Sequence, residues 1–421
     1  MKIKKIILLS FKNLTRYTRR TIITASAIAV GILIFIVADS ILKGAEVESQ
    51  RNLIEYETGA ARVYTENYWA EREKLPLKES IENPQALIKE LQEQGFRATT
   101  RTEFIGDIVV YKDPYPENGS MQVRIIAIDP DKDTKVFSLN KNITEGSWLS
   151  NSEEEDGIIM GAWLAEDIGA KVGYPITIST RTKYGASQTL DLVVKGIVNT
   201  NNPVINRTGI YIPKKIADRD LEMGESAAAI IINFSELANQ EKETKRLKNY
   251  ITEKHPNLHV ATWQELAPSF VSLAQAKQGG TKVVLIFLFV IAAVGISNTM
   301  LMSIYERFRE IGMMRAMGMS NKQIGLSFII EAAGIGLIGA AIGVLISIPT
   351  NIWLVNYGID YSFLTRKMDI GYRVAGAFKG TWDITSFIQA FFMGSILATV
   401  VAIFPVRRAF KKSIVDCLRY Q

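Results

Sequence analysis

The sequence predicts an α-helical membrane protein with four transmembrane helices and a large α+β extracytoplasmic domain inserted between helices 1 and 2. Three observations support this prediction. The 421 residues include four uncharged, apolar stretches long enough to cross a bilayer, which takes about 20 helical residues. A polar stretch of about 240 residues separates the first two. Basic residues outnumber acids beside the apolar stretches, whereas acids outnumber basic residues in the polar insert.

The apolar stretches set the boundaries of the predicted helices. They cover 21–38, 283–305, 332–359 and 384–406, and the third has apolar residues from Ile324 and one acid, Glu331, near its start. We therefore expect transmembrane helices at 21–42, 279–305, 323–357 and 384–406. Between and around them we expect a cytoplasmic amphipathic helix at 1–20, the extracytoplasmic domain at 43–278, a cytoplasmic helix at 306–322, an extracytoplasmic loop at 358–383 and a cytoplasmic tail at 407–421.

The charge distribution predicts the orientation. Residues 1–20 hold seven Lys and Arg and no acid, residues 306–322 hold four against two acids, and residues 407–421 hold five against one. The insert at 39–282 holds 29 against 36 acids. Because positively charged flanks stay in the cytoplasm, we expect both termini inside and the large domain outside. The net charge of +6 is then topogenic, and nucleic acid is not an expected partner.

Two alternatives concern the N-terminal region. Ile3, Ile7, Phe11 and Leu14 share one helical face, which predicts an amphipathic helix at the membrane surface; a helix packed on a partner protein is the alternative. A cleaved signal peptide is the alternative for the first span, although a 20-residue leader and an 18-residue apolar run are long for one.

The insert has the pattern of an α+β domain. Strand-prone runs separated by turn residues lie at 61–64, 105–111, 123–128, 175–179, 190–198 and 210–212. Two stretches read as strand, helix, strand, and their similar order suggests a weak internal repeat. These units are 62–64, 85–94 and 96–100, then 228–233, 236–252 and 258–261. A helix at 263–278 leads into the second span, so membrane helices flank the domain at both ends.

The composition argues against an enzyme. One cysteine (Cys417) and two neighbouring histidines (His255 and His259) exclude a disulfide framework and a Cys/His metal site. No catalytic constellation occurs in the insert, so we expect no catalytic residues, no metal and no cofactor in this chain. The phosphate-binding pattern G-x-x-x-x-G-K-[ST] is absent, and therefore the chain cannot hydrolyse ATP alone.

The third span is rich in small residues. Gly339 and Gly343 form a G-x-x-x-G pair, which allows two helix backbones to approach closely. Packing within the bundle and pairing between subunits both remain open.

A dense charged turn follows the second span. Glu306 and Arg309 are three residues apart, which suits a helical ion pair, while Arg315 lies five beyond Glu310. We therefore expect some of these charges to be available to a partner. Ile311, Met314 and Gly318 extend an apolar ridge on which adaptable Met side chains suit docking. A plain connector with topogenic charges is the alternative.

This turn resembles the signature of FtsX-like or MacB-type permeases, N-x-x-x-x-S-V-x-E-R-x-R-E-I-G-x-x-R-A-x-G-x-S, over Asn298–Ser320. The resemblance continues through Glu331 and the glycine-rich third span. It resumes at Phe404–Ala409 and at Ser413–Arg419, where Ser413 and Cys417 replace a Pro and an Ala of the usual ending. It covers the last 140 residues specifically and the one-plus-three layout of spans generally.

The resemblance implies a type VII ABC transporter permease. In that family the segment after the second span is a coupling helix seated on a separate ABC ATPase, and the matching residues are Glu306, Arg309, Glu310, Gly312, Arg315 and Gly318. It implies two copies of the ATPase, which binds ATP and Mg²⁺, and a second permease subunit in a homodimer or heterodimer. Position in the family suggests a structural or coupling role for Glu331.

Within the family, the size and layout are similar to those of the lipoprotein-releasing LolC, LolE and LolF group. That similarity implies a lipoprotein substrate and a periplasmic carrier or adaptor. A carrier-binding hairpin would lie at 179–190, with Arg181, Lys183 and Tyr184; an ordinary hairpin is the alternative. A lipid-lined substrate path would use the first two spans, with generic lipid-facing side chains as the alternative. Its residues would be Ile32, Phe35, Ile36, Phe289, Ile296 and Met300.

The sequence thus predicts a permease in the bacterial inner membrane that releases lipoproteins from its outer leaflet to a periplasmic carrier. ATP hydrolysis by the separate subunit would supply the energy. Two alternatives stay open: a MacB-like efflux or mechanotransmission permease, and an FtsX-like regulator of an extracytoplasmic partner.

Overall fold

The computed structural model describes residues 10, 12–110, 119–151, 156–234, 240–368 and 373–409. The chain forms two compact units. One, the helix bundle, contains Met1–Ala45, Ala274–Ile359 and Ala377–Gln421. The other, the inserted domain, contains Glu46–Leu273 together with Asp360–Gly376. The residues between the last two membrane helices therefore belong in part to the inserted domain.

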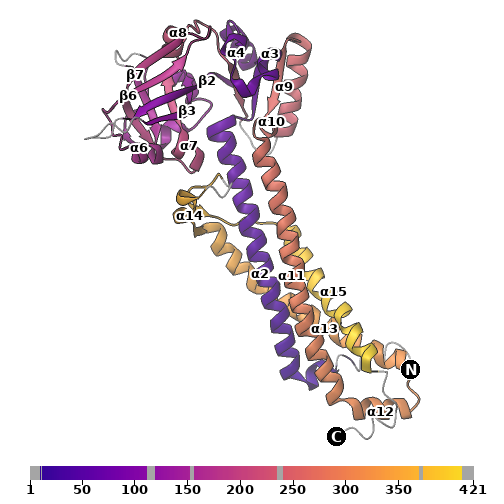
Figure 1. Cartoon of the computed structure of the whole chain (residues 1–421). Helices are drawn as coiled ribbons and strands as arrows, with labels where there is room; N and C mark the ends of the chain where they lie inside the picture. The colour runs from indigo at the N-terminus through magenta and orange to yellow at the C-terminus, as the bar shows by residue number, and fades with distance from the viewer. Residues whose placement is uncertain are drawn as a thin grey trace. The chain divides into compact units, whose positions relative to one another are not determined.

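Long helices build the bundle (Figure 1). They are α2 (Thr18–Asn52), α11 (Pro268–Glu306), α13 (Asn321–Asn356) and α15 (Ile384–Ala409), with the short α12 (Phe308–Ala316) between α11 and α13. Three described segments are long and apolar enough to cross a membrane: Thr21–Thr58, Asn321–Asn356 and Ile384–Arg408. The remaining predicted span lies within α11, which is not one of these three, so the number four stays a prediction.

Small residues bring the bundle helices together. A Cβ added to Gly339 would lie 2.7 Å from the Ala25 carbonyl oxygen, and one added to Gly343 would lie 2.9 Å from that of Ala29. Backbone contact this close is possible because glycine has no side chain. Ile28, Ile32 and Ile36 of α2 are buried with Ile296 and Met300 of α11 and with residues of α13 and α15 in one core.

The first half of the inserted domain is a split β-α-β fold. Its strands are β1 (Ala61–Thr65), β2 (Arg97–Val110), β9 (Ala229–Asn233) and β10 (Leu258–Thr262), in the sheet order β10-β1-β9-β2 with antiparallel neighbours. Helix α4 (Pro84–Glu93) joins β1 to β2, and α9 (Gln240–Lys254) joins β9 to β10. The two predicted strand-helix-strand units therefore interleave. Leu91 and Leu247 anchor the helices on the sheet core.

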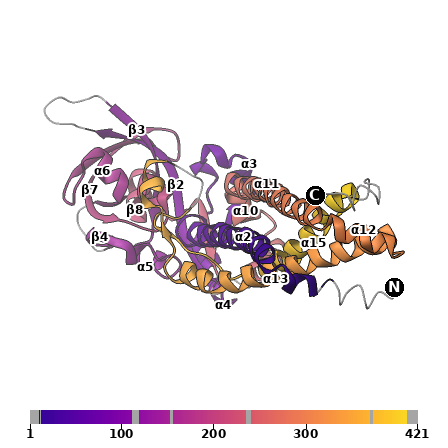
Figure 2. The ribbon, with the colours of Figure 1, turned by 90° about the horizontal axis from the view of Figure 1, so that it is seen from below.

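A ring of strands forms the second half (Figure 2). Between β2 and β9 the chain forms β3 (Gly119–Ile128), β4 (Ile143–Gly146), β5 (Gly157–Gly161), β6 (Pro175–Arg181), β7 (Ser187–Val198) and β8 (Ile210–Pro213). The pairings β2-β3-β8-β5-β7 continue through β6 back to β2, so the ring closes. Closure removes open sheet edges, and side chains such as Ile108, Ile125 and Ile178 fill the interior.

Short elements complete the inserted domain. They are η1 (Leu53–Thr58), α3 (Glu66–Ala70), η2 (Arg72–Lys74), η3 (Leu77–Glu79), α5 (Pro130–Asp133), η4 (Leu139–Asn142), α6 (Ala162–Ile168), α7 (Pro203–Thr208), α8 (Lys214–Asp220) and α10 (Trp263–Leu266). The segment between α13 and α15 contains β11 (Ile359–Asp360), α14 (Ser362–Lys367) and β12 (Ala377–Phe378). The sequence patterns predicted only a loop there.

Candidate functional site

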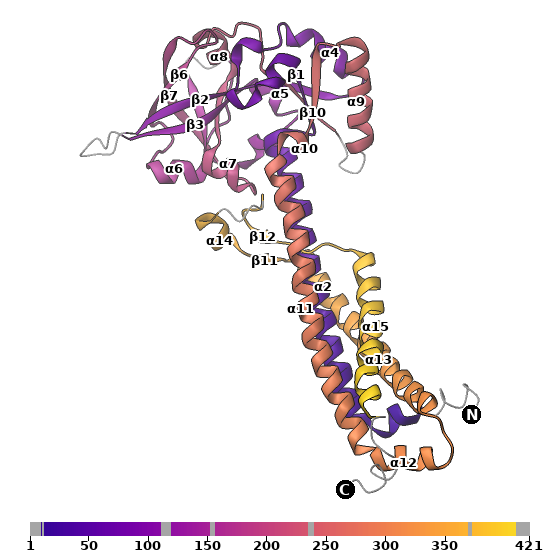
Figure 3. The ribbon, with the colours of Figure 1, turned by 45° about the vertical axis from the view of Figure 1, so that its right-hand side comes forward.

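The candidate site lies where α11 turns into α12, at one end of the bundle (Figure 3). Helix α11 ends at Glu306, and Arg307 leaves the helical conformation with φ −109° and ψ 13°. The turn after α12 uses Gly318 at φ +89°, a conformation that glycine adopts without strain. Ser320 then caps α13 in a capping box with Gln323. The turns at Arg307 and Gly318 thus separate α12 from α11 and from α13.

A buried ion pair fixes this corner. The Arg307 guanidinium donates to Glu331 Oε2 and to Glu310 Oε2, each at 3.0 Å. Arg307 is 5% exposed and Glu331 is fully buried, so each charge needs the other. Burial alone lowers the pKa of Arg307, but the carboxylates of Glu331 and Glu310 raise it above its ordinary value. The sequence interpretation missed Arg307, because Glu331 lies 24 residues away and no helical spacing joins them.

The N-terminal segment packs against the same corner. Tyr17 donates to Glu310 Oε1 at 3.3 Å, and Asn13 donates to Glu331 Oε2 at 3.5 Å. Leu14 is buried in the bundle core, and residues 12–16 are helical. Ile3, Ile7 and Phe11 lie outside the described residues. The described part of the N-terminal helix is thus joined to α12 and α13 by polar contacts.

The predicted coupling residues divide into exposed and buried groups. Glu306, Arg309 and Gly318 are exposed, Glu310 and Arg315 are half-buried, and Gly312 is buried. Arg315 already has an interaction within the chain. Because the helix breaks at Arg307, Glu306 and Arg309 do not share a continuous helix, and the observed pair with spacing of three is Arg307 with Glu310.

The prediction that Ile311, Met314 and Gly318 form an apolar docking ridge was wrong about which face of α12 is exposed. Ile311 is 1% exposed and belongs to the bundle core, with Met314 packed against it. The opposite face of α12 is exposed instead, with Met313 at 50% and Met317 at 77%. Together with Arg309, these two Met residues form an exposed stripe at a spacing of four residues. We call Arg309, Met313 and Met317 the α12 stripe.

A surface hollow of about 650 Å³ adjoins the stripe. It lies between the N-terminal segment and α12, and cations and Met side chains dominate its lining. The lining residues are Lys12, Asn13, Arg16, Arg307, Glu310, Met313, Met314, Ala316 and Met317. Because Arg16 and Arg307 already contact Glu310, this surface offers a protein partner chiefly its apolar Met side chains.

Family comparisons decide the class of protein. Residues 21–250, more than half of the chain, match the MacB-like periplasmic core domain, and residues 282–414 match the FtsX-like permease C-terminal family. The chain belongs to the FtsX/MacB type of ABC transporter permease. The second match contains the whole of α12, both of its turns and Glu331.

Curated relatives agree with this class. YtrF, an ABC transporter permease of Bacillus subtilis, is 34% identical over 139 residues, which are 31% of this chain and 29% of the relative. The macrolide export ATP-binding/permease protein MacB of Pasteurella multocida is 24% identical over 282 residues, 65% of this chain and 40% of the relative. The chain thus spans less than half of these relatives. The uncharacterized ABC transporter permease MJ1507 of Methanocaldococcus jannaschii is 22% identical over 432 residues, which cover 100% of this chain and 98% of the relative.

Among solved structures, the periplasmic region of MacB from Actinobacillus actinomycetemcomitans is similar at 14% identity and a TM-score of 0.35. The match covers 53% of this permease and 97% of that chain. A score this low carries no argument about the fold, which rests on the strand pairings above.

The predicted substrate-path residues of the permease lie in the bundle core. Ile32, Phe35 and Ile36 of α2 are at most 6% exposed, and Ile296 and Met300 of α11 are at most 3% exposed. The side chain of Phe289 lies outside the described part of the structure. A path along these residues therefore requires α2 and α11 to separate.

The predicted hairpin is formed by β6 and β7. Tyr184 is 70% exposed at the turn, Arg181 is exposed, and Lys183 is half-buried with its ammonium 3.3 Å from Ser226 Oγ. These residues belong to a strand pair that also closes the ring, so the hairpin has a structural role whatever it binds.

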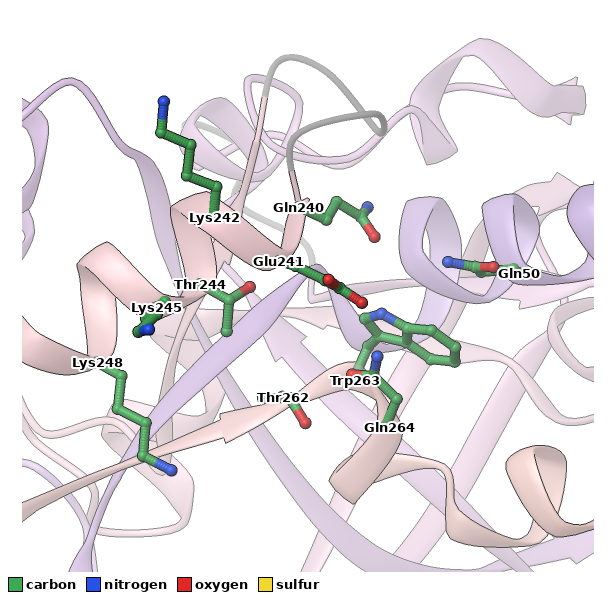
Figure 4. A pocket seen from close by; sticks show the side chains of 10 residues that line it. All are labelled: Gln50, Gln240, Glu241, Lys242, Thr244, Lys245, Lys248, Thr262, Trp263 and Gln264. Carbon is green, nitrogen blue, oxygen red and sulfur yellow. The ribbon is translucent and has the colours of Figure 1, made fainter.

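A further hollow of about 770 Å³ lies in the inserted domain (Figure 4). In this view the Glu241 carboxylate points toward the Trp263 ring, whereas Lys242 points away from it. The charged side chains that line this hollow therefore do not converge on one point.

Within the described residues, no group of three or more His, Cys, Asp or Glu side chains could hold a metal ion.

Proposed function

We propose that this chain is the membrane subunit of an ABC transporter and that a separate ABC ATPase binds the α12 stripe. The observation that carries the proposal is the continuity of α11. This single helix of 39 residues begins at Pro268, six residues after the last strand of the inserted domain, and ends at Glu306 beside α12. Force applied to α12 would be passed along this helix toward the inserted domain.

The buried corner supports a role in transmission. Arg307 joins the start of α12 to Glu331 of α13, so α12 cannot move without moving α13 or breaking a buried ion pair. ATP and Mg²⁺ would bind to the partner. Two ATPases and two permease subunits would close together, with both termini in the cytoplasm and the inserted domain outside the bacterial inner membrane.

The test is co-expression of the chain with the ABC ATPases of its host and isolation in nanodiscs. Met313→Ser combined with Met317→Ser should reduce ATPase binding at least tenfold, because both side chains are exposed and neither supports the core. Arg309→Ala should weaken it less. Met368→Ser, at an exposed Met of the inserted domain, is the matched control. Equal ATPase binding by all of these variants would contradict the proposal that the ATPase binds the α12 stripe.

For the cargo, we propose lipoprotein release to a periplasmic carrier. Burial of Ile32, Phe35, Ile296 and Met300 supports a cycle in which separation of α2 from α11 creates an apolar surface for acyl chains. Each CH₂ moved out of hydrocarbon costs about 0.8 kcal/mol, so such a surface is needed. Nanodiscs containing a triacylated lipoprotein, the permease and its ATPase should release lipoprotein only with ATP and carrier.

A MacB-like efflux or mechanotransmission role is the second candidate. The match of residues 21–250 to the MacB-like periplasmic core domain favours it. ATP hydrolysis without lipoprotein release would favour this role or an FtsX-like regulatory role. Carrier-independent export of a soluble substrate would single out efflux.

A further inference from the structure

The long strand β2 changes partners along one edge. It pairs with β9 over Arg97–Arg101 and with β6 over Gly106–Val109, while β3 pairs along its other edge. Residues 102–105 therefore lie at a fork where β9 ends and β6 begins. Small-molecule sites are usually concave pockets with a partly apolar lining, and a place where two neighbouring strands part can hold such a pocket.

A groove of about 500 Å³ lies at this fork. Lys74, Arg181 and Lys183 line it, and Asp107 is the one acidic residue in the described part of the lining. Lys74 forms an exposed ion pair with Glu71, and Lys183 contacts Ser226, whereas the Arg181 guanidinium has no ion pair with any residue that the structure describes. The groove thus has an excess of positive charge.

The same groove has an apolar floor. Leu77 and Phe104 are buried, and Ile105 is 42% exposed at the side. The Thr182 hydroxyl beside it is buried away from solvent, and among the described residues it has no hydrogen-bond partner. Leu75, also in the lining, has a left-handed φ of +50°, a strain typical of binding sites.

We propose that this groove binds a small anionic amphiphile, in which a carboxylate or phosphate group meets Arg181 and Lys183 and an apolar body covers Leu77 and Ile105. The size of the groove suits a ligand of this kind. The proposal goes beyond ATPase coupling, because the groove lies wholly in the inserted domain and does not require the partner. It also differs from carrier docking on the hairpin, since the exposed Tyr184 does not line the groove.

The test is calorimetric titration of the full chain in nanodiscs, with empty nanodiscs as the blank. Phenyl phosphate and benzoate are the amphiphilic probes, one with a phosphate and one with a carboxylate group. Inorganic phosphate carries only the anionic group, and benzyl alcohol carries only the apolar ring. We expect the two amphiphiles to bind at least tenfold more tightly than either half. Equal binding of phenyl phosphate and inorganic phosphate would overturn the proposal by reducing the site to a simple anion site.

Variants separate a ligand site from a structural feature. Arg181→Ala combined with Lys183→Ala should weaken phenyl phosphate binding at least tenfold, and Tyr184→Ser should leave it unchanged. Thr182→Val should raise the thermal midpoint, because it removes an unpaired buried hydroxyl. Unchanged binding in the double variant, or a loss with Tyr184→Ser as large as with the double variant, would overturn the assignment.

Discussion

Arg307 Nη1 lies 3.0 Å from Glu331 Oε2, and both side chains are buried where α11, α12 and α13 meet. A pair of this kind does little for net stability, but it leaves a costly uncompensated charge when one member is removed. It therefore ties the position of α12 to α13. Asn13 donates to Glu331, and Tyr17 donates to Glu310, the second carboxylate that Arg307 contacts. The N-terminal segment therefore shares this constraint.

Glu331→Gln should destabilise the bundle by about 3 kcal/mol, the lower end of the range for breaking a buried pair, since Glu310 still faces Arg307. The measurement is the midpoint of thermal unfolding of the purified chain in detergent. Arg307→Met combined with Glu331→Leu should recover most of the loss, because the apolar pair leaves no unpaired charge. Glu306→Gln, at an exposed carboxylate, should change the midpoint little. Equal midpoints for Glu331→Gln and Glu306→Gln would contradict the buried-pair interpretation.

Sequence patterns predicted much of this fold because they reflect local physics. Apolar length predicted the three membrane-length helices that the structure describes, and α4 (Pro84–Glu93) lies within one residue of the helix predicted at 85–94. The interleaving of β1 with β9 and the closing of the ring by β6 depend on pairings between distant residues, which periodicity does not encode. Ile311 was assigned to the wrong face for the same reason, since a short amphipathic helix does not reveal which side meets the core.

Gly343→Ala should destabilise the bundle by about 1–3 kcal/mol, the usual cost of overpacking. Its new methyl group would lie 2.9 Å from both the Ala29 carbonyl oxygen and the Ile32 Cβ, and helix backbone cannot easily shift. Gly31→Ala on α2 is the matched control, because nothing lies within 4 Å of its added Cβ. That control should be neutral or stabilising by up to about 1 kcal/mol. If both variants unfold at the same temperature, α13 does not pack on α2 through this glycine.

The buried Glu103 should make the inserted domain sensitive to acid. Burial by itself raises the pKa of Glu103, but the charges of Arg62 and Arg124 and the hydrogen bond from Arg62 lower it below its ordinary value. The unfolded chain therefore takes up the proton first as the pH falls. This contribution is fully present above the unfolded pKa of about 4.3 and is lost as the pH falls through the lower folded pKa.

Glu103→Gln tests this sign. The variant should unfold at a lower temperature than the parent at pH 7, because Arg62 stays buried, and the difference should shrink as the pH falls from 5 to 3. Tryptophan fluorescence of the full chain follows both transitions, and Glu145→Gln, at an exposed site in β4, is the control. A difference that stays constant over this pH range would show that Glu103 does not titrate as described.

The side chain of Arg373 should help to hold residues 373–376 against the rest of the inserted domain. Its guanidinium donates to Glu57 Oε1 at 2.9 Å, and its carbonyl accepts from Asn52 Nδ2 at 2.6 Å. The same Glu57 oxygen accepts from Asn202 Nδ2 at 2.7 Å, so the carboxylate joins two segments. Arg373→Ala removes the charged bond but leaves the backbone contacts, which predicts local loosening and not unfolding.

Hydrogen exchange followed by mass spectrometry measures that loosening directly. A hydrogen bond to a charged group contributes about 1.5–3 kcal/mol, so amides of residues 373–376 should exchange at least tenfold faster in Arg373→Ala than in the parent. Lys367→Ala, at an exposed position between α13 and α15, should leave exchange unchanged. Faster exchange throughout the inserted domain would instead indicate global destabilisation, and unchanged exchange at 373–376 would mean that the backbone bonds alone hold the segment. Glu57→Gln should fall between the parent and Arg373→Ala, because glutamine can still accept from Asn202 but no longer offers Arg373 a charge.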